Sequence, residues 1–476
     1  MNETSKLTIV PSVDDDGSKR TGKPYSTPGT WVSASAHIIT AVIGSGVLSL
    51  SWAIAQLGWI AGLIALVFFS VVTWFTSILL ADCCRDPVSG TRCSCYMDVV
   101  KSNLGGINTK FCGIAQYVNL VGTTIGYSIT SAISMAAIKR SGCFHNRGHS
   151  AGCHVKNNKF MIIFGIIEIV LSQIPDFNEL SWLSVLAAVM SFGYSCIGLG
   201  LSIAKVAGGS HPRTSLTGTT VGVDVTKWQK IWNCSEALGN IAFSYAFSTV
   251  LIEIQASLLD TLKSSPPENE SMKKATSAGI SITTMFYISC GALGYAAFGN
   301  NAPGNFLTGF GFFEPYWLID IANMFIIVHL VGAYQVFCQP IFNRVEDWCI
   351  SQWPNNSFTK ESSPIKLPLF GDYTFSTLRL VWRTAYVITT VVVAMILPFF
   401  NGILGLLGAV SFWPLTVYFP IRMHISRENI PPFCWKWIWL NMLVVVCLII
   451  SLLAAAGSIA AISKDLSTYK PFNSVS

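Results

Sequence analysis

The sequence predicts an all-helical, polytopic membrane protein with eleven transmembrane helices. Hydrophobic residues make up 51% of its 476 residues and charged residues only 11%, against about a quarter charged in an average soluble domain. Its mean hydropathy is +0.53. A transmembrane helix needs about 20 apolar residues, and the chain contains eleven stretches that approach or exceed this length. A β-barrel is excluded because alternating strands are missing.

The eleven stretches divide the chain into a membrane domain with a tail at each end. They cover residues 31–57, 60–81, 111–138, 160–172, 181–204, 231–259, 275–298, 316–341, 381–400, 402–423 and 435–462. We expect residues 1–29 to form a mobile cytoplasmic tail without signal-peptide character, residues 30–463 to form the membrane domain, and residues 464–476 to form an extracellular tail.

Two of these stretches are interrupted at mid-membrane depth. Gly44-Ser45-Gly46 lies in the middle of the first stretch, and residues 239–248 put small and polar side chains into the centre of the sixth. Unpaired peptide groups cost several kcal/mol in hydrocarbon, so irregular backbone survives there only beside a cavity or a solute. The alternative is that the glycines only let two helices approach closely.

The sixth stretch comes five stretches after the first. This is the separation expected for two inverted repeats of five helices, each beginning with a discontinuous helix. The first repeat would cover about residues 30–205 and the second about 229–423. One extra helix, at about 435–463, follows them.

Basic residues indicate the orientation. With a cytoplasmic N-terminus, 19 of the 30 Lys and Arg residues fall on the inside, which also makes the C-terminus extracellular. The loop 139–159 carries five basic residues on the outside and weakens this assignment. It also contains Cys143 and Cys153, a pair that an oxidising compartment joins, although two free thiols remain the alternative. The net charge of +6 suits loops beside an anionic leaflet and requires no nucleic-acid partner.

Several motifs resemble those of plant amino acid permeases, which are proton-coupled carriers of the amino acid/auxin permease family. They are GTWVSASAHIITAVIGSGVLSL (29–50), SQIPDF (172–177), GYAAFG (294–299), PGNFLTGFGF (303–312) and FWPLTVYFP (412–420). The resemblance extends over nearly the whole chain from Gly29. It implies a LeuT-like fold, a place in the plasma membrane, and uptake of amino acid substrates together with protons.

An unwound helix also offers the chemistry that a zwitterion needs. Freed N–H groups at the positive end of a half-helix suit a carboxylate, and unwound carbonyls suit an ammonium group. We expect the carboxylate at Gly44, Ser45, Gly46 and Val47. By likeness to LeuT-like proteins, we expect the ammonium group at the carbonyls of Ile43, Ala242 and Phe243.

The sixth stretch is expected to complete the substrate site. Phe243, Tyr245 and Phe247 are candidates for the side-chain pocket, although aromatic residues in a membrane span more often serve packing. Ser244 and Asn240 are further candidates. Asn240 is neutral, which favours neutral substrates over cationic ones.

Proton coupling needs a titratable group within the membrane. His37 and His329 are the only histidines inside the predicted spans, and an intramembrane ionisable residue suggests function by default. The alternative is two neutral histidines bonded to carbonyls. Asp320 and Glu253 are acidic candidates for the same role, and Glu168 competes with them.

Other functions remain as alternatives. A sodium-coupled carrier and an auxin influx carrier share the scaffold, while a channel or an amino acid sensor would be of a different class. No Walker loop, zinc-ligand helix or nucleophile elbow occurs, so we expect neither an enzyme nor a metal or organic cofactor.

Overall fold

The computed structural model describes most of the predicted membrane domain. The described residues are 31–87, 93, 95–148, 150, 152–174, 181–209, 212–258, 268–311, 315–354, 356, 358–359, 365–367, 371–373 and 376–469. The predicted N-terminal tail and the end of the predicted C-terminal tail lie outside them.

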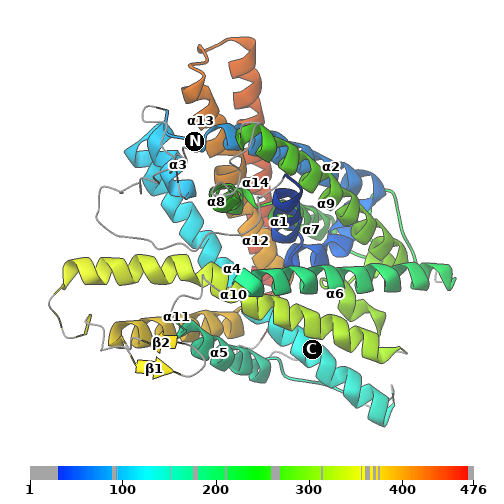
Figure 1. Cartoon of the computed structure of the whole chain (residues 1–476). Coiled ribbons are helices and arrows are strands. Elements are labelled where there is room, and N and C mark those ends of the chain that lie inside the picture. The colour runs from blue at the N-terminus through cyan, green and yellow to red at the C-terminus, as the bar shows by residue number, and fades with distance from the viewer. Residues whose placement is uncertain are drawn as a thin grey trace, which may run out of the picture.

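Helices account for nearly all regular structure in the described residues (Figure 1). The first half contains α1 (Trp31–Val42), the 3-10 helix η1 (Ser45–Ser49), α2 (Leu50–Asp82), α3 (Tyr96–Leu104), α4 (Gly106–Arg147), α5 (Asn158–Ser172), α6 (Ser181–Ala207), α7 (Lys227–Ser244) and α8 (Ser248–Leu258). The second half contains α9 (Glu268–Phe298), η3 (Gly299–Asn301), η4 (Phe306–Phe310), α10 (Tyr316–Gln352), β1 (Ile365–Leu367), β2 (Gly371–Tyr373), α11 (Thr377–Ile396), α12 (Phe400–Ser411), the π-helix η5 (Phe412–Tyr418), α13 (Phe419–Arg427) and α14 (Trp435–Thr468).

Every predicted apolar stretch contains helix. By length and composition, eight helices of the described residues are able to cross a membrane, namely Ser45–Asp82, Gly106–Arg147, Leu186–Ala207, Asn269–Asn301, Tyr316–Gln352, Thr377–Ile396, Phe400–Arg427 and Trp435–Ser467. The other helical stretches are shorter: α5 has 15 residues, and α1, α7 and α8 are pieces of interrupted helices. The chain is therefore a multi-pass, helical membrane protein.

Gly58 separates the first two predicted stretches inside α2. Its φ is +83° and its ψ is 176°, a conformation that favours glycine. A Cβ atom there would overlap the backbone of residues 216–218. Two backbone hydrogen bonds hold the loop before α7 against this part of α2. Trp59 N donates to Ser215 O at 3.3 Å, and Thr219 N donates to Ala55 O at 2.9 Å. A turn, not a continuous helix, thus follows Leu57.

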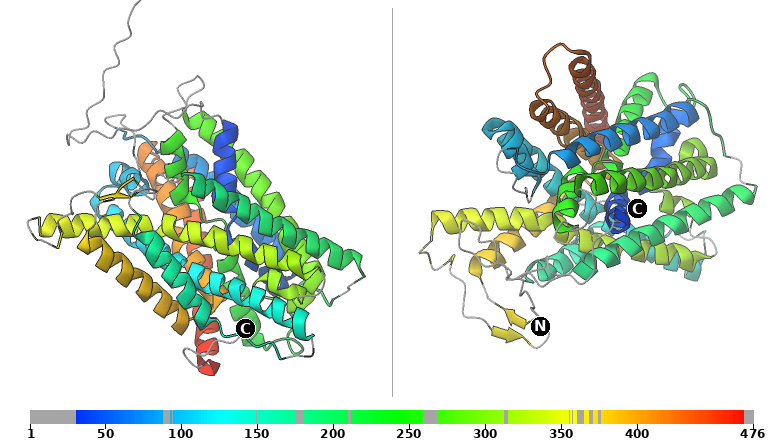
Figure 2. Two further views of the ribbon diagram at one scale, coloured as in Figure 1. Left: turned by 60° about the horizontal axis from the view of Figure 1, so that its bottom comes forward. Right: turned by 45° about the horizontal axis from the view of Figure 1, so that its top comes forward.

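Helix packing puts the interrupted helices at the centre. Figure 1 shows α1, α7 and α12 in the middle of the bundle, and Figure 2 shows that the long α10 crosses it. α7 packs against α12, α14 and α2, whereas α1 packs mainly against α9. α10 packs on α4 and α6. The irregular backbone is therefore covered by other helices, as the cost of unpaired peptide groups in lipid requires.

Two features differ from the sequence expectation. The antiparallel pair β1–β2 forms a small ribbon outside the helical bundle (Figure 2), so the protein is all-helical in its membrane part only. The short helix α3 lies in the connection between the second and third predicted stretches and buries Tyr96, Val99 and Val100. Cys143, near the end of α4, forms a disulfide with Cys153, with the two Cα atoms 6.0 Å apart.

Candidate functional site

The break after α1 leaves three successive peptide N–H groups unused. Ile43 N still donates to Ile39 O at 2.9 Å, and helicity resumes when Val47 N donates to Gly44 O at 3.3 Å. Between them, the N–H groups of Gly44, Ser45 and Gly46 have no acceptor among the described residues. Ser45 and Gly46 are buried, and Gly44 is half-buried. Because η1 runs directly into α2, these donors stand at the positive end of a helical segment, where an anion is stabilised.

The second break, between α7 and α8, is a tight turn. Tyr245 N donates to Ala242 O at 3.2 Å, and Ala246 N donates to Phe243 O at 3.1 Å. The carbonyls of Ala242 and Phe243, which we expected to face an ammonium group, therefore already accept one hydrogen bond each in this structure. Each carbonyl keeps a second lone pair.

Gly46 and Ser244 bring the two breaks into direct contact. A Cβ atom on Gly46 would lie 2.5 Å from Ser244 Oγ and 2.9 Å from Ser244 Cα. Only glycine therefore fits at residue 46 without displacing the end of α7. The Ser244 hydroxyl donates to Asn240 O at 3.0 Å, which is an ordinary way for serine to end a helix.

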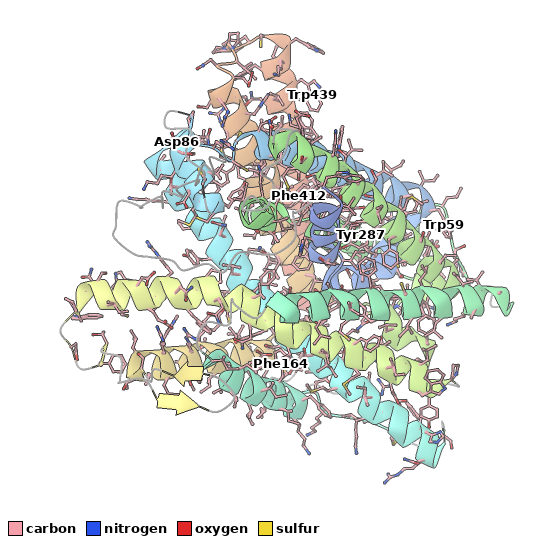
Figure 3. All side chains as sticks on the ribbon, viewed as in Figure 1. Trp59, Asp86, Phe164, Tyr287, Phe412 and Trp439 are labelled. Atoms are coloured by element: carbon pink, nitrogen blue, oxygen red, sulfur yellow. A yellow bond between two sulfur atoms is a disulfide. The ribbon has the colours of Figure 1, made fainter. Side chains whose placement is uncertain are left out.

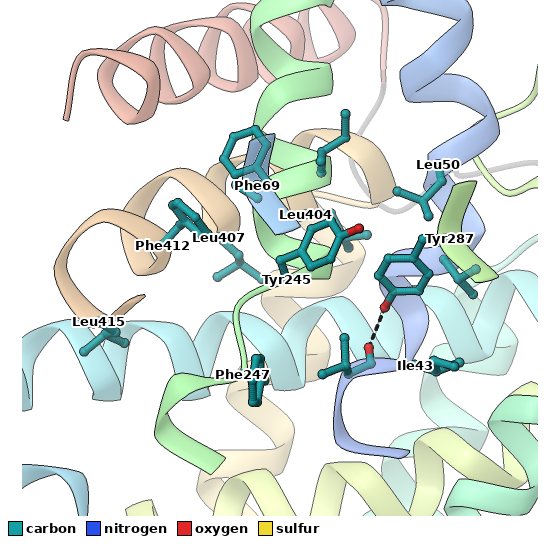
Figure 4. Packing of buried hydrophobic residues seen from close by; sticks show 14 of the residues in the cluster. Ile43, Leu50, Phe69, Tyr245, Phe247, Tyr287, Leu404, Leu407, Phe412 and Leu415 are labelled. Carbon is teal, nitrogen blue, oxygen red and sulfur yellow. Dashed lines mark hydrogen bonds between the residues drawn. The ribbon is translucent and has the colours of Figure 1, made fainter. Parts of the chain in front are cut away.

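Tyr287 of α9 joins the two breaks through its hydroxyl. The hydroxyl oxygen lies 2.6 Å from Val42 O, the last carbonyl of α1, a contact drawn as a dashed line in Figure 4. It also lies 3.2 Å from Ser244 O, the last carbonyl of α7. The side chain is fully buried and lies in the interior of the bundle beside α1 (Figure 3). One hydroxyl thus serves two carbonyls that lost their helical partners. We did not predict Tyr287 from the sequence, where a single tyrosine in an apolar stretch gives no signal.

His329 of α10 faces the first break from another side. Its Nδ1 lies 2.8 Å from Ala187 O, and a Cβ atom on Gly44 would lie 3.8 Å from its Nε2. The side chain is only 7% exposed. If Nδ1 donates its proton to the Ala187 carbonyl, then Nε2 is the atom that gains or loses a proton beside Gly44.

The other proton-coupling candidates lie elsewhere or outside the described side chains. His37 is exposed on α1. Asp320 lies on α10 nine residues before His329, and its Oδ1 is buried without a hydrogen-bond partner in the described part of the chain. The side chain of Glu253 lies outside the described residues. Glu168 of α5 is fully buried and accepts a hydrogen bond from Gln335 Nε2 at 2.6 Å.

The structure brings together only part of the predicted substrate site. Ile43 to Val47, Ser244 and Tyr245 meet at the two breaks. Phe247 is buried in the apolar core (Figure 4), and Tyr245 Oη donates to Thr284 Oγ1 at 3.4 Å. Phe243 packs at the side of α12, because a Cβ atom on Gly408 would lie 2.7 Å from Phe243 N.

Asn240 makes its described side-chain approach to α12 and not to the first break. A Cβ atom on Gly405 of α12 would lie 3.3 Å from Asn240 Oδ1 and 2.4 Å from Ser458 Oγ of α14. Asn240 Oδ1 therefore lies where α7 packs against α12 and α14, one helical turn before Ser244. Its side chain is fully buried, and neither side-chain polar atom has a partner among the described residues.

Comparisons with known proteins place this arrangement in context. The family model described as "Transmembrane amino acid transporter protein" matches residues 27–464. Amino acid permease 6 of Arabidopsis thaliana is 61% identical over 464 residues, which cover 96% of this chain and 94% of that protein. Amino acid permease 1 of the same plant is 60% identical over 467 residues, with 98% and 94% coverage.

A solved structure shares the fold. The crystal structure of MhsT in complex with L-phenylalanine aligns with a TM-score of 0.51 at 11% sequence identity, covering 90% of this chain and 99% of that one. At this identity the likeness concerns the fold alone, which is LeuT-like.

Proposed function

Because the chain belongs to the transmembrane amino acid transporter protein family, we propose that it imports amino acids together with protons by alternating access. Its relatives are named permeases, so the chain is a transporter and not an enzyme. Neutral amino acids are the preferred class, with a broad range of side chains. The coupling ion is the proton, and no cofactor takes part.

The observation that carries the proposal is the row of three free N–H groups at Gly44, Ser45 and Gly46. A buried peptide N–H without a partner is costly, and three in succession at a helix start suit a carboxylate. The carbonyl of Ile43, for which the described residues provide no hydrogen-bond donor, suits the ammonium group of the same molecule. An α-amino acid presents both charges at this spacing, whereas a channel needs no such fixed cradle.

His329 is our first candidate for the protonated group. Its Nε2 stands beside Gly44, so a proton there changes the charge next to the bound carboxylate. That coupling favours binding of proton and substrate together. Asp320 and His37 are alternatives that no described contact brings to either break, and Glu253, whose side chain lies outside the described residues, is a third.

We further propose a membrane topology. The two breaks fall in the first and the sixth of eleven spans, consistent with five-plus-five inverted repeats and one extra helix, α14. The N-terminus would be cytoplasmic and the C-terminus extracellular, in the plasma membrane. The distribution of Lys and Arg supports this orientation, and so does the Cys143–Cys153 disulfide, which then lies outside.

Uptake into cells that lack their own amino acid transport tests the proposal. We expect expression of the chain to confer saturable, stereoselective uptake of radiolabelled neutral amino acids, with an inward current that grows as external pH falls in sodium-free medium. A current that requires sodium would mean that sodium, and not the proton, is the coupling ion. Uptake of an auxin without any amino acid would assign the chain to auxin import, and binding without net uptake would make it a sensor.

A further inference from the structure

A cavity with a volume of about 380 Å³ opens at one end of the bundle, apart from both helix breaks. It lies among the end of the first predicted span, the start of α7, the segment 304–308, the start of α12 and the end of α14. In the proposed topology all of these segments lie at the extracellular side. The cavity has room for several water molecules, so a side chain that lines it can exchange protons with the outside solution.

Glu236 on α7 is an acidic residue that lines this cavity from within the bundle. Its side chain is 4% exposed and has no hydrogen bond or ion pair in the described part of the chain. Other helices pack tightly on the backbone beside it. A Cβ atom on Gly457 of α14 would lie 2.7 Å from Glu236 N, and one on Gly405 of α12 would lie 3.1 Å from Glu236 O. Water in the cavity is therefore what solvates this carboxylate.

Two charged side chains of α14 line the same cavity. Lys464 and Asp465 are both exposed at its mouth. The Asp465 carboxylate lies close enough to that of Glu236 for the two to repel each other. The Lys464 ammonium group acts in the opposite sense, because a positive charge favours an ionised carboxylate.

The other elements around Glu236 supply no partner for its charge in the described residues. On α7 itself, Lys230 and Cys234 both donate to a backbone carbonyl of α2. η1, α12 and the part of α2 before Gly58 also pack on α7, and none of them contains a titratable side chain. The cavity segment 304–308 contains none either. Water and the two side chains of α14 are therefore the surroundings of this charge.

The position of Glu236 on α7 links the cavity to the candidate substrate site. Glu236, Asn240 and Ser244 follow one another at intervals of four residues, so they share one face of the helix. Ser244 forms the contact with Gly46 at the breaks. Glu236 lies two turns, about 12 Å, outward of that contact. A movement of α7 that closes the cavity therefore also moves the end of the helix that borders the substrate.

Closing the outside is costly while Glu236 is ionised. Alternating access requires the cavity to lose its water before the inside opens. An ionised carboxylate that loses its water without gaining a partner is far more costly than a neutral carboxyl group, and the charge of Asp465 adds repulsion. A proton on Glu236 removes both costs.

We propose that Glu236 is a second proton-binding residue, which must be protonated from the extracellular cavity before the outer face closes over bound substrate. A hydronium ion in the cavity donates its proton to a carboxylate oxygen of Glu236, which leaves water and a neutral carboxyl group. When the cavity opens again, the proton returns to the same side. Glu236 thus makes closure depend on external pH, whereas His329 holds the proton that crosses. This inference rests on the proposed function, because it requires alternating access.

Uptake of radiolabelled L-alanine by voltage-clamped cells that express the full chain tests this role, at external pH values between about 5 and 8. Wild-type uptake per molecule at the cell surface should fall as the external pH rises. E236Q is neutral at every pH, so at the alkaline end its uptake should exceed that of wild type by about threefold or more, with the same charge moved per alanine. E236D should restore the fall. E270Q, the same acid-to-amide change at the exposed start of α9, is the matched control and should behave like wild type.

The two charged neighbours on α14 test the same site without a change at Glu236. D465N removes a repelling charge and should move the half-maximal pH of uptake to a lower value, by about 0.5 pH unit. K464Q removes an attracting charge and should move it to a higher value. Both side chains are exposed, so neither change disturbs the core. A merely structural role of Glu236 would leave both values unchanged.

The outcomes separate this inference from the proposed function. A wild-type pH dependence of uptake in E236Q overturns the inference while transport still stands. A smaller charge per alanine in E236Q overturns it too, because Glu236 would then carry a proton across. If E236Q does not reach the cell surface, an unchanged half-maximal pH in D465N and K464Q has the same consequence. A wild-type chain that transports no amino acid at any pH overturns the proposed function and this inference together.

Discussion

Gly46 lies against Ser244 so closely that a Cβ atom would come within 2.5 Å of the serine hydroxyl oxygen. The two residues lie far apart along the chain, and each stands beside a helix break. Their contact holds the free N–H groups of the first break next to the end of α7. The geometry of the candidate site therefore depends on the absence of a side chain at residue 46.

Replacing Gly46 by alanine should abolish transport. The added methyl group must displace Ser244 or residues 44–46, and such overpacking costs about 1–3 kcal/mol. We expect uptake of radiolabelled alanine to fall at least tenfold while the protein still reaches the membrane. Gly106→Ala is the control, because nothing lies within 4 Å of a Cβ atom at that residue. Wild-type uptake by G46A would show that the contact is not needed.

Replacing Tyr287 by phenylalanine should impair transport without removing the ring. The change leaves the carbonyls of Val42 and Ser244 without their shared donor, at a cost of about 1–3 kcal/mol. We expect a lower maximal uptake rate and a lower melting temperature in detergent. Tyr334→Phe removes another buried hydroxyl, which bonds Thr390 Oγ1 at 2.7 Å, and should lower the melting temperature only. Equal uptake by the two variants would contradict a special role for Tyr287.

These residues also show what the sequence predicts and what it does not. Long apolar stretches identify the helices, and interruption by Gly44-Ser45-Gly46 identifies the first break, because both signals are local. Contacts between distant segments are not local. Tyr287 serves carbonyls that lie 245 and 43 residues away along the chain, and its own neighbours give no indication of this.

Asn240 shows a related limit of prediction from the sequence. It lies four residues before Ser244, so its place in the chain suggests the same site, yet it faces α12 and α14. Residues four apart share one face of a helix, so Asn240 is separated from the break by one turn of α7, at the depth where α12 and α14 pack against this helix. Which neighbour a side chain on this face meets is set by helix packing, and not by the local polarity of residues 239–248.

His329→Gln should remove the dependence of uptake on protons. Glutamine keeps a polar side chain of similar size but has no titratable group beside Gly44. We expect the pH-dependent current in sodium-free medium to disappear, while exchange of labelled for unlabelled alanine continues. His154→Gln, at an exposed loop residue, serves as the control. A wild-type pH dependence in H329Q would reject His329, and loss of the current in His37→Gln instead would assign coupling to His37.

Arg383→Met should destabilise the protein strongly. Arg383 Nε lies 2.7 Å from Glu346 Oε1, and its Nη1 donates to Ser172 O at 2.7 Å. Both ionic side chains are less than 10% exposed. Without Arg383 the buried carboxylate loses its main partner, which costs about 3–5 kcal/mol.

An exposed ion pair provides the comparison for this stability change. Lys273→Met breaks the bridge to Asp82, whose side chain is 31% exposed, and should cost no more than about 1 kcal/mol. Thermal unfolding in detergent measures both variants. Similar melting temperatures for R383M and K273M would mean that burial adds little to the Arg383–Glu346 pair.

Asp224 should keep the loop before α7 folded throughout the mildly acidic pH range in which a proton-coupled carrier works. Its Oδ2 accepts from Thr220 N at 2.7 Å and from Asn300 Nδ2 at 2.9 Å. The Thr220 N–H is the main cause that lowers the pKa of this carboxyl below its ordinary value. A lowered pKa in the folded state means that the stabilisation is complete above the unfolded pKa of about 3.9 and is lost only as the pH falls through the folded pKa.

Hydrogen exchange at the Thr220 amide measures this effect. After correction for intrinsic exchange rates, we expect constant protection between about pH 7 and pH 5, since both values lie above the ordinary carboxyl pKa, and a loss of protection at lower pH. Asp224→Asn should reduce the protection already at neutral pH and remove its pH dependence, because a neutral amide oxygen is the weaker acceptor. Asp98→Asn on α3 is the control. Protection that falls between pH 7 and pH 5 in the wild-type chain would mean that another group, with a higher pKa, holds the loop.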